Sequence, residues 1–248
     1  MGRALGHVQL VVAATASTRR ANARERVTVE FQSVQDALRF LGPVSGGLLV
    51  ELGRHHPYTG RHSLRVANLV QTCCKNMGMP PAETAKCVKA ALLHDVGKID
   101  VPIYVLNDPG RPGPEAWETL RNHSNAGFRR VAALAGNGEI ARIVRAVHER
   151  MDGGGYPDGL AGEMIPLESR IIAVCDAYEA MTSDERSYKP AFSAAVTETT
   201  LNNMAGPQFD KNIVSALLDT VADADMRGDL TRLLLRSDNK TDGALTVA

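Results

Sequence analysis

The sequence predicts an all-α fold, and three observations support this prediction. Several segments of the 248-residue chain carry apolar residues at three- and four-residue spacing, which is the period of a helix with one buried face. No convincing run of alternating apolar and polar residues, the pattern of a half-buried strand, is present. Aromatic residues make up only 4% of the chain, which argues against an aromatic-rich β-sandwich. We therefore expect helices packed in a bundle-like arrangement.

The expected helices follow one another between short stretches rich in glycine and proline. In the first, apolar residues recur on one face from Val66 to Met77, and Gly78 ends the run. Five glycines and a proline between residues 152 and 162 require a loop there. The expected helices cover residues 63–77, about 82–95, 115–123, about 140–147 and 166–182, with two or three more toward the C-terminus.

The composition predicts a globular protein that binds neither a nucleic-acid polymer nor a membrane. Lys+Arg and Asp+Glu number 28 each, so the formal net charge is zero, whereas binders of polyanions usually carry a basic excess. No run of 18 apolar residues is present, so we expect no membrane-spanning helix. The four cysteines form no CxxC pair, which favours reduced core cysteines and a cytoplasmic protein over a disulfide framework.

The most specific chemical feature is the His94–Asp95 doublet, which ends an apolar helix face formed by residues 90–93. Neutral imidazole and carboxylate groups bind divalent metals such as iron, manganese, zinc or nickel. With further ligands nearby, a carboxylate such as Asp95 could bridge two metals about 3.5–4 Å apart, and a hydroxide between them would be a nucleophile at neutral pH. The alternative interpretation of the doublet alone is the polar end of a helix.

Asp176 strengthens the metal hypothesis, because the residues on both sides of it are apolar. A buried carboxylate is costly unless it is paired or bound to a metal. The alternative for Asp176 is a buried ion pair with Arg170 or Arg186. Together with His62, the doublet and Asp176 offer two imidazoles and two carboxylates from three expected helices.

At this point the sequence resembles a known family. The His94–Asp95 doublet is similar to the signature of the HD superfamily of metal-dependent phosphohydrolases, and the string from His148 to Pro157 resembles its HD-GYP branch. The likeness covers about residues 57–218, with ordered motifs rather than one short match. The segments that carry it are Tyr58–Val66, His94–Ile99, Asn107–Gly110, His148–Pro157, Val174–Tyr178 and Gly206–Asp210.

The resemblance implies a fold, an activity and a set of site residues. The fold would be an HD-domain helical bundle over residues 46–220, with a short, weakly structured N-terminal extension at 1–45 and a C-terminal helix and mobile tail at 221–248. The activity would be hydrolysis of cyclic di-GMP by a hydroxide that two metal ions activate, with Fe or Mn preferred and Zn, Ni or Mg as alternatives. The implied metal ligands are His62, His94, Asp95, His123, His148 and Asp176.

The resemblance also implies substrate contacts and partners. Asp95 and Lys98 would be catalytic, with Lys98 contacting the scissile phosphate. Tyr156, Arg186 and Lys189 would bind the substrate, and the loop that contains Tyr156 would dock GGDEF-domain proteins. A homodimer is a further expectation. Trp117 is expected in the core.

The chain departs from the family pattern at several positions. Val147 stands where the family usually has a histidine ligand, and Tyr58 stands where three-metal members have a glutamate. One extra residue also separates the expected basic pair, Arg186 and Lys189, from the preceding Thr-Ser. Tyr58 argues against a third metal, whereas Val147 and the shifted basic pair favour an alternative, a catalytically weakened HD-GYP module that acts as a signalling or protein-binding partner. An HD phosphohydrolase of mononucleotides or alarmones is a third hypothesis.

Overall fold

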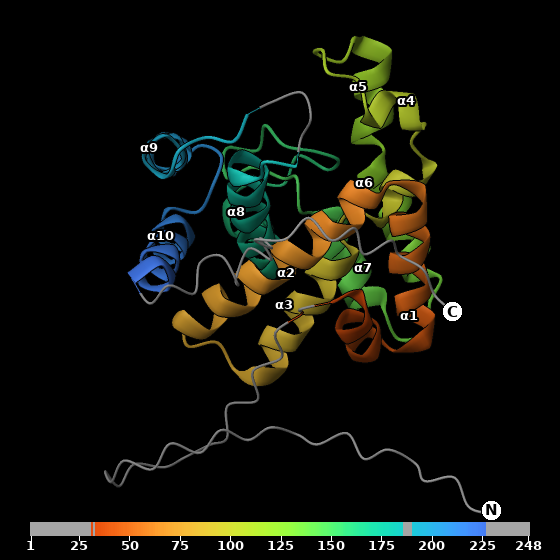
Figure 1. The fold of residues 1–248 in the computed structure, drawn as a ribbon, viewed down its shortest axis with the longest axis horizontal. Coiled ribbons are helices and arrows are strands. Elements are labelled where there is room, and N and C mark those ends of the chain that lie inside the picture. Colours follow the sequence, from red (N-terminus) through yellow and green to blue (C-terminus); the bar gives the residue numbers. More distant parts are fainter. Residues whose placement is uncertain (1–30, 32, 186–189, 227–248) are drawn as a thin grey trace, which may run out of the picture.

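The computed structural model describes residues 31, 33–185 and 190–226, and in these residues it is built of helices without a β-sheet (Figure 1). The all-α prediction is therefore confirmed. The helices are α1 Val34–His55, α2 Pro57–Asn76, α3 Pro81–Leu93, α4 Ile103–Leu106, α5 Pro114–Arg121, α6 His123–Ala132, α7 Gly138–Arg145, α8 Leu167–Thr182, α9 Ala194–Met204 and α10 Lys211–Met226. Two 3₁₀ turns, η1 Val96–Asp100 and η2 Gly162–Met164, complete the elements.

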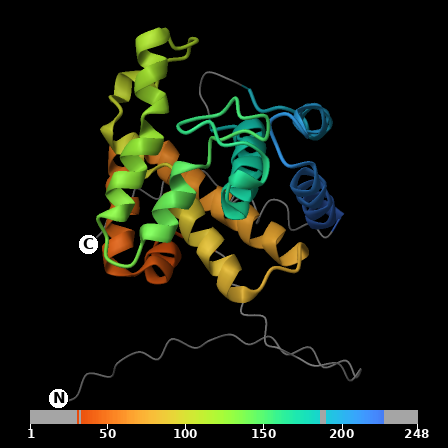
Figure 2. The ribbon, with the colours of Figure 1, turned by 180° about the vertical axis from the view of Figure 1, so that it is seen from behind.

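Helix α2 lies at the centre of the bundle and packs against α1, α3, α8 and α10 (Figures 1 and 2). It begins at Pro57, six residues before the expected start, because a proline at the first helical position needs no hydrogen-bond acceptor. His62 therefore lies in the second turn of α2 rather than at its beginning. Most of this helix is buried, including Leu69 and Val70 with no exposed surface.

Helix α1 crosses the boundary that we expected at residue 45. It begins after Ser33, whose side chain accepts a hydrogen bond from the backbone N–H of Asp36 while the Asp36 carboxylate accepts one from Ser33. Gly42 has a φ of 73°, which kinks the helix ahead of Pro43. Residues 34–45 are thus part of a helix that packs on α2, whereas residues 1–30 and 32 of the predicted extension lie outside the described residues.

The single helix expected at 115–123 is two helices. Helix α5 ends at Arg121, and His123 begins α6. Both views show α5 standing away from the main body of the bundle, beyond α6 (Figures 1 and 2). Trp117 of α5 is half exposed, and its ring lies 6.5 Å from the Tyr156 ring in the loop after α7.

A close approach of η1 to α6 brings two distant parts of the sequence together. A Cβ atom on Gly97 would lie 1.9 Å from the carbonyl oxygen of His123 and 2.5 Å from the backbone nitrogen of Gly127. Only glycine fits at such a crossing. Because Asp95 immediately precedes η1 and His123 begins α6, this contact positions their side chains beside each other.

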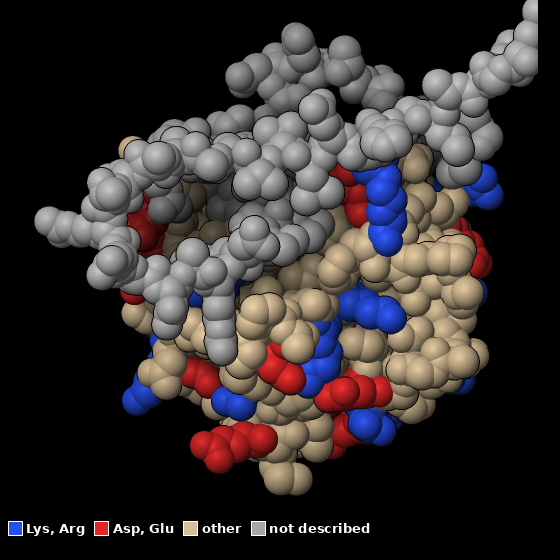
Figure 3. All heavy atoms as spheres, turned by 90° about the horizontal axis from the view of Figure 1, so that it is seen from below, with Lys and Arg blue, Asp and Glu red and all other residues tan. Residues whose placement is uncertain are grey.

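The surface of the described residues carries both signs of charge. On the face drawn in Figure 3, Lys and Arg side chains lie among Asp and Glu side chains rather than in one basic patch. None of the described helices combines the length and the apolar character that crossing a membrane would require.

Candidate metal centre

Two groups of side chains at the middle of the bundle could each hold a metal ion, and they share one carboxylate. The first group is His62, His94 and Asp95, and the second is Asp95, His123 and His148. In each group the ligand atoms lie within 4.8 Å of one another. Asp95 is fully buried and belongs to both groups, so the same carboxylate could contribute a ligand atom to either candidate site.

The first group forms where α3 ends against α2. His94 follows the last residue of α3, and its Nδ1 donates a hydrogen bond to the carbonyl oxygen of Ala91 over 2.7 Å. This contact turns Nε2 toward the centre, where it is buried 3.5 Å from Asp95 Oδ2. The imidazole of His62 crosses that of His94 with 5.4 Å between the ring centroids.

The second group joins α6 to the end of α7. The Nε2 atoms of His123 and His148 are 2.9 Å apart, and His123 Nε2 lies 3.7 Å from Asp95 Oδ1. The other nitrogen of His123 donates to the carbonyl oxygen of Leu120, which leaves Nε2 directed at the centre. At this distance the two rings share a hydrogen bond, and the same two nitrogens together with the Asp95 carboxylate could serve as ligands of a cation.

Asp176 joins the centre from α8. Its Oδ1 lies 2.9 Å from His62 Nε2 and 3.9 Å from His94 Nε2, and its side chain is 21% exposed. The alternative prediction of an ion pair between Asp176 and Arg170 is wrong, because the Arg170 guanidinium pairs with Asp210 at 2.8 Å. Arg186, the other alternative partner, lies outside the described residues.

Two buried atoms without a hydrogen-bond partner indicate that the residues of the centre fit a bound cation. Among the described residues, His94 Nε2 and Asp95 Oδ1 are buried without a hydrogen-bond partner. Buried polar atoms are almost always satisfied, so these two call for a ligand that the protein itself does not supply. An imidazole nitrogen and a carboxylate oxygen are both donors that divalent metals accept.

The charges of the centre also suit cations. Burial raises the pKa of Asp95, but Lys98 and the surrounding histidines outweigh burial and hold that pKa well below its usual value. Burial lowers the pKa of His123 to about 3 and that of His148 to about 4, so both imidazoles are neutral at pH 7. Ionised carboxylates and neutral imidazoles are the forms that bind metals.

His62 differs from the other imidazoles because acids surround it. Burial lowers its pKa, but Glu179 and Asp176 outweigh burial and raise the pKa to about 10. Burial also raises the pKa of Asp176, but contact with His62 more than offsets this and holds that pKa below its usual value. A proton therefore balances the acids around His62 when no cation does.

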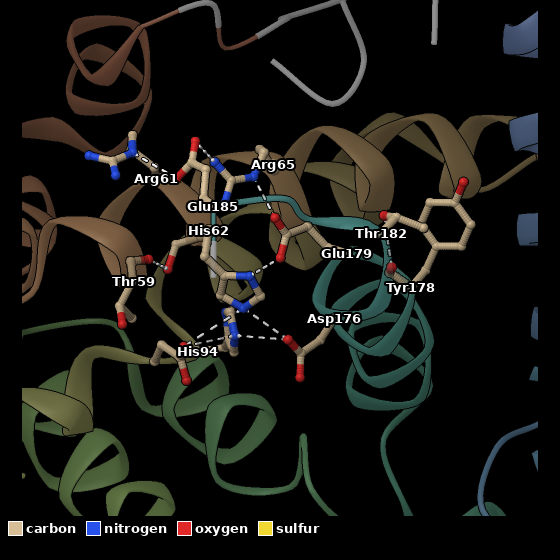
Figure 4. A network of polar contacts seen from close by, with 12 residues as sticks. Thr59, Arg61, His62, Arg65, His94, Asp176, Tyr178, Glu179, Thr182 and Glu185 are labelled. Carbon is tan, nitrogen blue, oxygen red and sulfur yellow. Dashed lines mark hydrogen bonds and ion pairs between the residues drawn. The ribbon is translucent and has the colours of Figure 1, made fainter. Parts of the chain in front are cut away.

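A chain of ion pairs orients His62 from behind, and Figure 4 shows it in one view. His62 Nδ1 donates to Glu179, which also accepts from the Arg65 guanidinium. Arg65 in turn contacts Glu185 at 2.9 Å, and Glu185 accepts from Arg61 at 3.0 Å. A carboxylate on the far nitrogen of a metal-binding histidine fixes which nitrogen faces the metal.

Sequence reasoning missed Glu179 and Arg65, although a signal was present. Glu179 follows Asp176 by three residues, so both lie on one face of α8. A second acid on that face of an otherwise apolar helix indicates that a cationic side chain pairs with it in the interior. The partner Arg65 follows His62 by the same interval on α2.

Lys98, which the resemblance implies as a phosphate contact, lies beside Asp95. Its Nζ is 2.7 Å from Asp95 Oδ2, one turn of η1 away, and its side chain is partly exposed. Arg186 and Lys189, the expected phosphate-binding pair, lie outside the described residues. Tyr58 stacks on His62 with 6.1 Å between centroids, and it provides no carboxylate for a third metal.

A cavity of about 430 Å³ opens beside the second group. Its lining includes His148, Asp176, Val147, Tyr156 and Trp117. Tyr156 stacks on the imidazole of His148, with 5.1 Å between centroids and 23° between planes. Val147 is 1% exposed and contributes an apolar wall at the position where the resemblance expects a ligand. The interpretation of Trp117 as a core residue is wrong, because it is 48% exposed at this cavity.

The loop that carries Tyr156 is held in place by one buried acid. The two oxygens of Glu149 accept the backbone N–H groups of Asp158, at 2.7 Å, and Leu160, at 3.0 Å. Gly155 passes so close to this residue that a Cβ would lie 2.5 Å from the Cα of Glu149. The loop is therefore fixed against the end of α7 and is not merely a connector.

Comparison with known proteins places this arrangement in a family. Residues 50–213 match the family model described as HD domain. A cyclic di-GMP phosphodiesterase of Pseudomonas aeruginosa is 36% identical over 179 residues, which is 70% of this chain and 42% of the relative. The response regulator RpfG of Xanthomonas campestris, also named a cyclic di-GMP phosphodiesterase, is 37% identical over 157 residues, covering 62% of this chain and 41% of the relative. A 3'3'-cGAMP-specific phosphodiesterase of Vibrio cholerae is 33% identical over 165 residues, covering 65% of this chain and 36% of the relative.

The chain thus spans less than half the length of these curated relatives.

Solved structures agree on the fold. A cyclic GMP-AMP specific phosphodiesterase of V. cholerae aligns with a TM-score of 0.56 at 16% identity, over 79% of this chain and 50% of that one. The HD domain of the phosphodiesterase PgpH of L. monocytogenes aligns with a TM-score of 0.53 at 19% identity, over 73% of this chain and 97% of that one. From the matched family model and these relatives, the chain belongs to the HD domain family, in its HD-GYP branch.

Proposed function

We propose that this protein is a metal-dependent phosphodiesterase that hydrolyses cyclic di-GMP at the centre described above, with two divalent cations. The observation that carries the proposal is the single buried carboxylate, Asp95, shared by two ligand groups. The relatives named as cyclic di-GMP and cGAMP phosphodiesterases support a cyclic dinucleotide as the substrate class. The donor set mixes imidazole with carboxylate and contains no thiolate, which suits iron, manganese, zinc or nickel, and the resemblance favours iron or manganese among them.

When bound, the two cations would neutralise phosphate charge and lower the pKa of the attacking water. The residues of the chain hold and shape the rest of the site. Asp95 keeps Lys98 at the edge of the centre, where a partly exposed ammonium can contact a phosphate oxygen. Asp176 and His148 belong both to the centre and to the cavity lining, so a substrate in the cavity would present its phosphate to the cations. Tyr156 would pack against the substrate from the loop, and Arg186 and Lys189 would hold its second phosphate.

The direct test is turnover of cyclic di-GMP by the purified full chain with Mn²⁺ or with Fe²⁺ under reducing conditions. We expect a linear dinucleotide or a mononucleotide product, and we expect Asp95→Asn to abolish it because both ligand groups lose their shared member. Absence of turnover with either cation, from protein shown to contain metal, would contradict the proposal.

A second candidate function is favoured by Val147. This side chain is buried and apolar, so His123, His148 and Asp95 are the members that the described residues offer to the second cation. The protein would then be a catalytically weakened HD-GYP module that acts as a signalling or protein-binding partner. Val147→His decides between the two: activity gained from an inactive wild type supports the second function, and an already active wild type supports the first.

The cellular setting stays a prediction. The resemblance implies that a GGDEF-domain protein docks on the loop at Tyr156, and a homodimer and a cytoplasmic location are further predictions. The four cysteines are buried and free, as in a reducing compartment.

A further inference from the structure

The outer wall of the cavity carries a tryptophan and an arginine that the metal chemistry does not use. Trp117 and Arg121 are four residues apart on α5, so their side chains lie on one face of the helix. Both line the cavity that reaches His148 and Asp176. No residue of α5 is fully buried, so packing alone does not account for a tryptophan at this position.

Arg121 has no carboxylate partner among the described residues. The other arginine of the cavity, Arg150, is paired with Asp152 at 2.6 Å and donates to Gln208 at 2.8 Å. The Arg121 guanidinium instead lies 4.8 Å from the centroid of the Tyr156 ring. Its five N–H donors are therefore available to a molecule in the cavity.

Aromatic contacts connect this wall to the metal centre. Tyr156 stacks on His148, and the Trp117 ring meets the Tyr156 ring edge to face with 6.5 Å between centroids. A ligand with its phosphate at the centre would therefore meet an aromatic surface and a cation in the same cavity. A nucleotide combines a phosphate with a flat base that can occupy such a surface.

We propose that Trp117 and Arg121 form a guanine-binding subsite, in which the base stacks on the indole and the guanidinium donates to guanine O6 and N7. This inference rests on the proposed function and names the part of the site that selects the base. Guanine presents two acceptors, O6 and N7, whereas adenine presents an acceptor and an amino donor at the same positions. The rigid fork of arginine matches the two acceptors of guanine, and lysine lacks that fork. The subsite therefore predicts a preference for cyclic di-GMP over cyclic di-AMP.

The experiment uses Trp117 itself, because it is the only tryptophan in the chain. The full-length protein is mixed rapidly with cyclic di-GMP or cyclic di-AMP, and the first phase of tryptophan fluorescence is recorded before turnover. We expect saturable quenching by cyclic di-GMP at lower concentration than by cyclic di-AMP. Arg121→Ala should weaken cyclic di-GMP binding by about tenfold or more, since a bidentate arginine–guanine pair discriminates by that order. Binding of cyclic di-AMP should change by less than about twofold.

Two further variants make the result specific. Arg121→Lys keeps the charge but not the fork, so it should lose the guanine preference as Arg121→Ala does. Arg129→Ala removes an exposed arginine of α6 that does not line the cavity, and it should leave both affinities unchanged. Equal losses for the two dinucleotides in Arg121→Ala, rescue by lysine, or fluorescence that cyclic di-GMP does not change would each overturn the subsite.

Binding and turnover measurements distinguish failure of the guanine subsite from failure of the proposed phosphodiesterase function. If wild type is quenched selectively by cyclic di-GMP but does not hydrolyse it with Mn²⁺ or Fe²⁺, the subsite stands and the proposed function fails. If wild type hydrolyses cyclic di-GMP and Arg121→Ala does so with unchanged kcat/KM, the proposed function stands and the subsite fails.

Discussion

Replacing Glu179 by glutamine tests how the protein controls its metal centre from outside it. The buried Glu179 carboxylate accepts from His62 Nδ1 and from the Arg65 guanidinium (Figure 4). Glu179→Gln keeps the shape and one oxygen acceptor but removes the charge that both partners face. The variant therefore perturbs the orientation and basicity of His62 without deleting a ligand.

The size of the effect follows from these contacts. Loss of a carboxylate behind a metal-binding histidine typically weakens metal affinity by about 10- to 100-fold. The stability cost should be about 1–3 kcal/mol, the usual cost of leaving a buried polar group poorly satisfied. It should not reach the roughly 3–5 kcal/mol of a fully broken buried ion pair, because Arg65 keeps its contact with Glu185.

The assay measures metal affinity by competition with a chelator, alongside unfolding in denaturant. Arg61→Ala is the matched control, because it breaks the outermost pair of the same network, between two side chains that solvent reaches. Such a pair contributes at most about 1 kcal/mol, and its loss should leave metal affinity unchanged. Equal metal affinity in wild type and Glu179→Gln, with the variant folded, would refute the view that Glu179 orients His62.

Three further predictions follow from the geometry. Gly97→Ala should lower the free energy of unfolding in denaturant by about 1–3 kcal/mol or more, because the added Cβ would meet backbone atoms of α6. Gly47→Ala is the control and should not lower it, because the space around Gly47 is open. Equal unfolding midpoints for the two variants would contradict the close approach of η1 to α6. Elemental analysis should find about two metal ions per chain in wild type, fewer than one in Asp95→Asn and about one in His148→Ala, and identical losses in the two variants would exclude separate sites. Glu149→Ala should free the backbone N–H groups of the Tyr156 loop and speed their hydrogen exchange, and unchanged protection would show that other contacts hold the loop.

The fold class and most of the centre could be predicted from the sequence because their signals are local. Helical periodicity is a property of short windows, and together with the missing strand pattern and the low aromatic content it predicts the all-α class. The doublet at His94 and the lone acid Asp176 stand out against apolar neighbours without knowledge of the fold. The structure brings the doublet and Asp176 close to His62, His123 and His148, and the roles of these residues as metal ligands stay a prediction.

Other features depend on contacts that no local pattern contains. The pairing of Glu179 with Arg65 joins residues 114 positions apart, and the crossing at Gly97 places α6 against η1. Trp117 was expected in the core because large aromatic side chains usually bury, but the break before His123 leaves α5 standing away from the bundle.

The sequence by itself determined that the chain is helical, which donors it offers to a metal, and where the glycine-rich loop must turn. Only the tertiary structure decided that one carboxylate belongs to two ligand groups and that an ion-pair network supports His62. It also decided that a tryptophan faces the same cavity as an arginine that has no carboxylate partner in the part of the chain the structure describes. The physical reason is range: hydrophobic periodicity and turn chemistry act between neighbours, whereas a site is defined by distances between side chains that packing alone brings together.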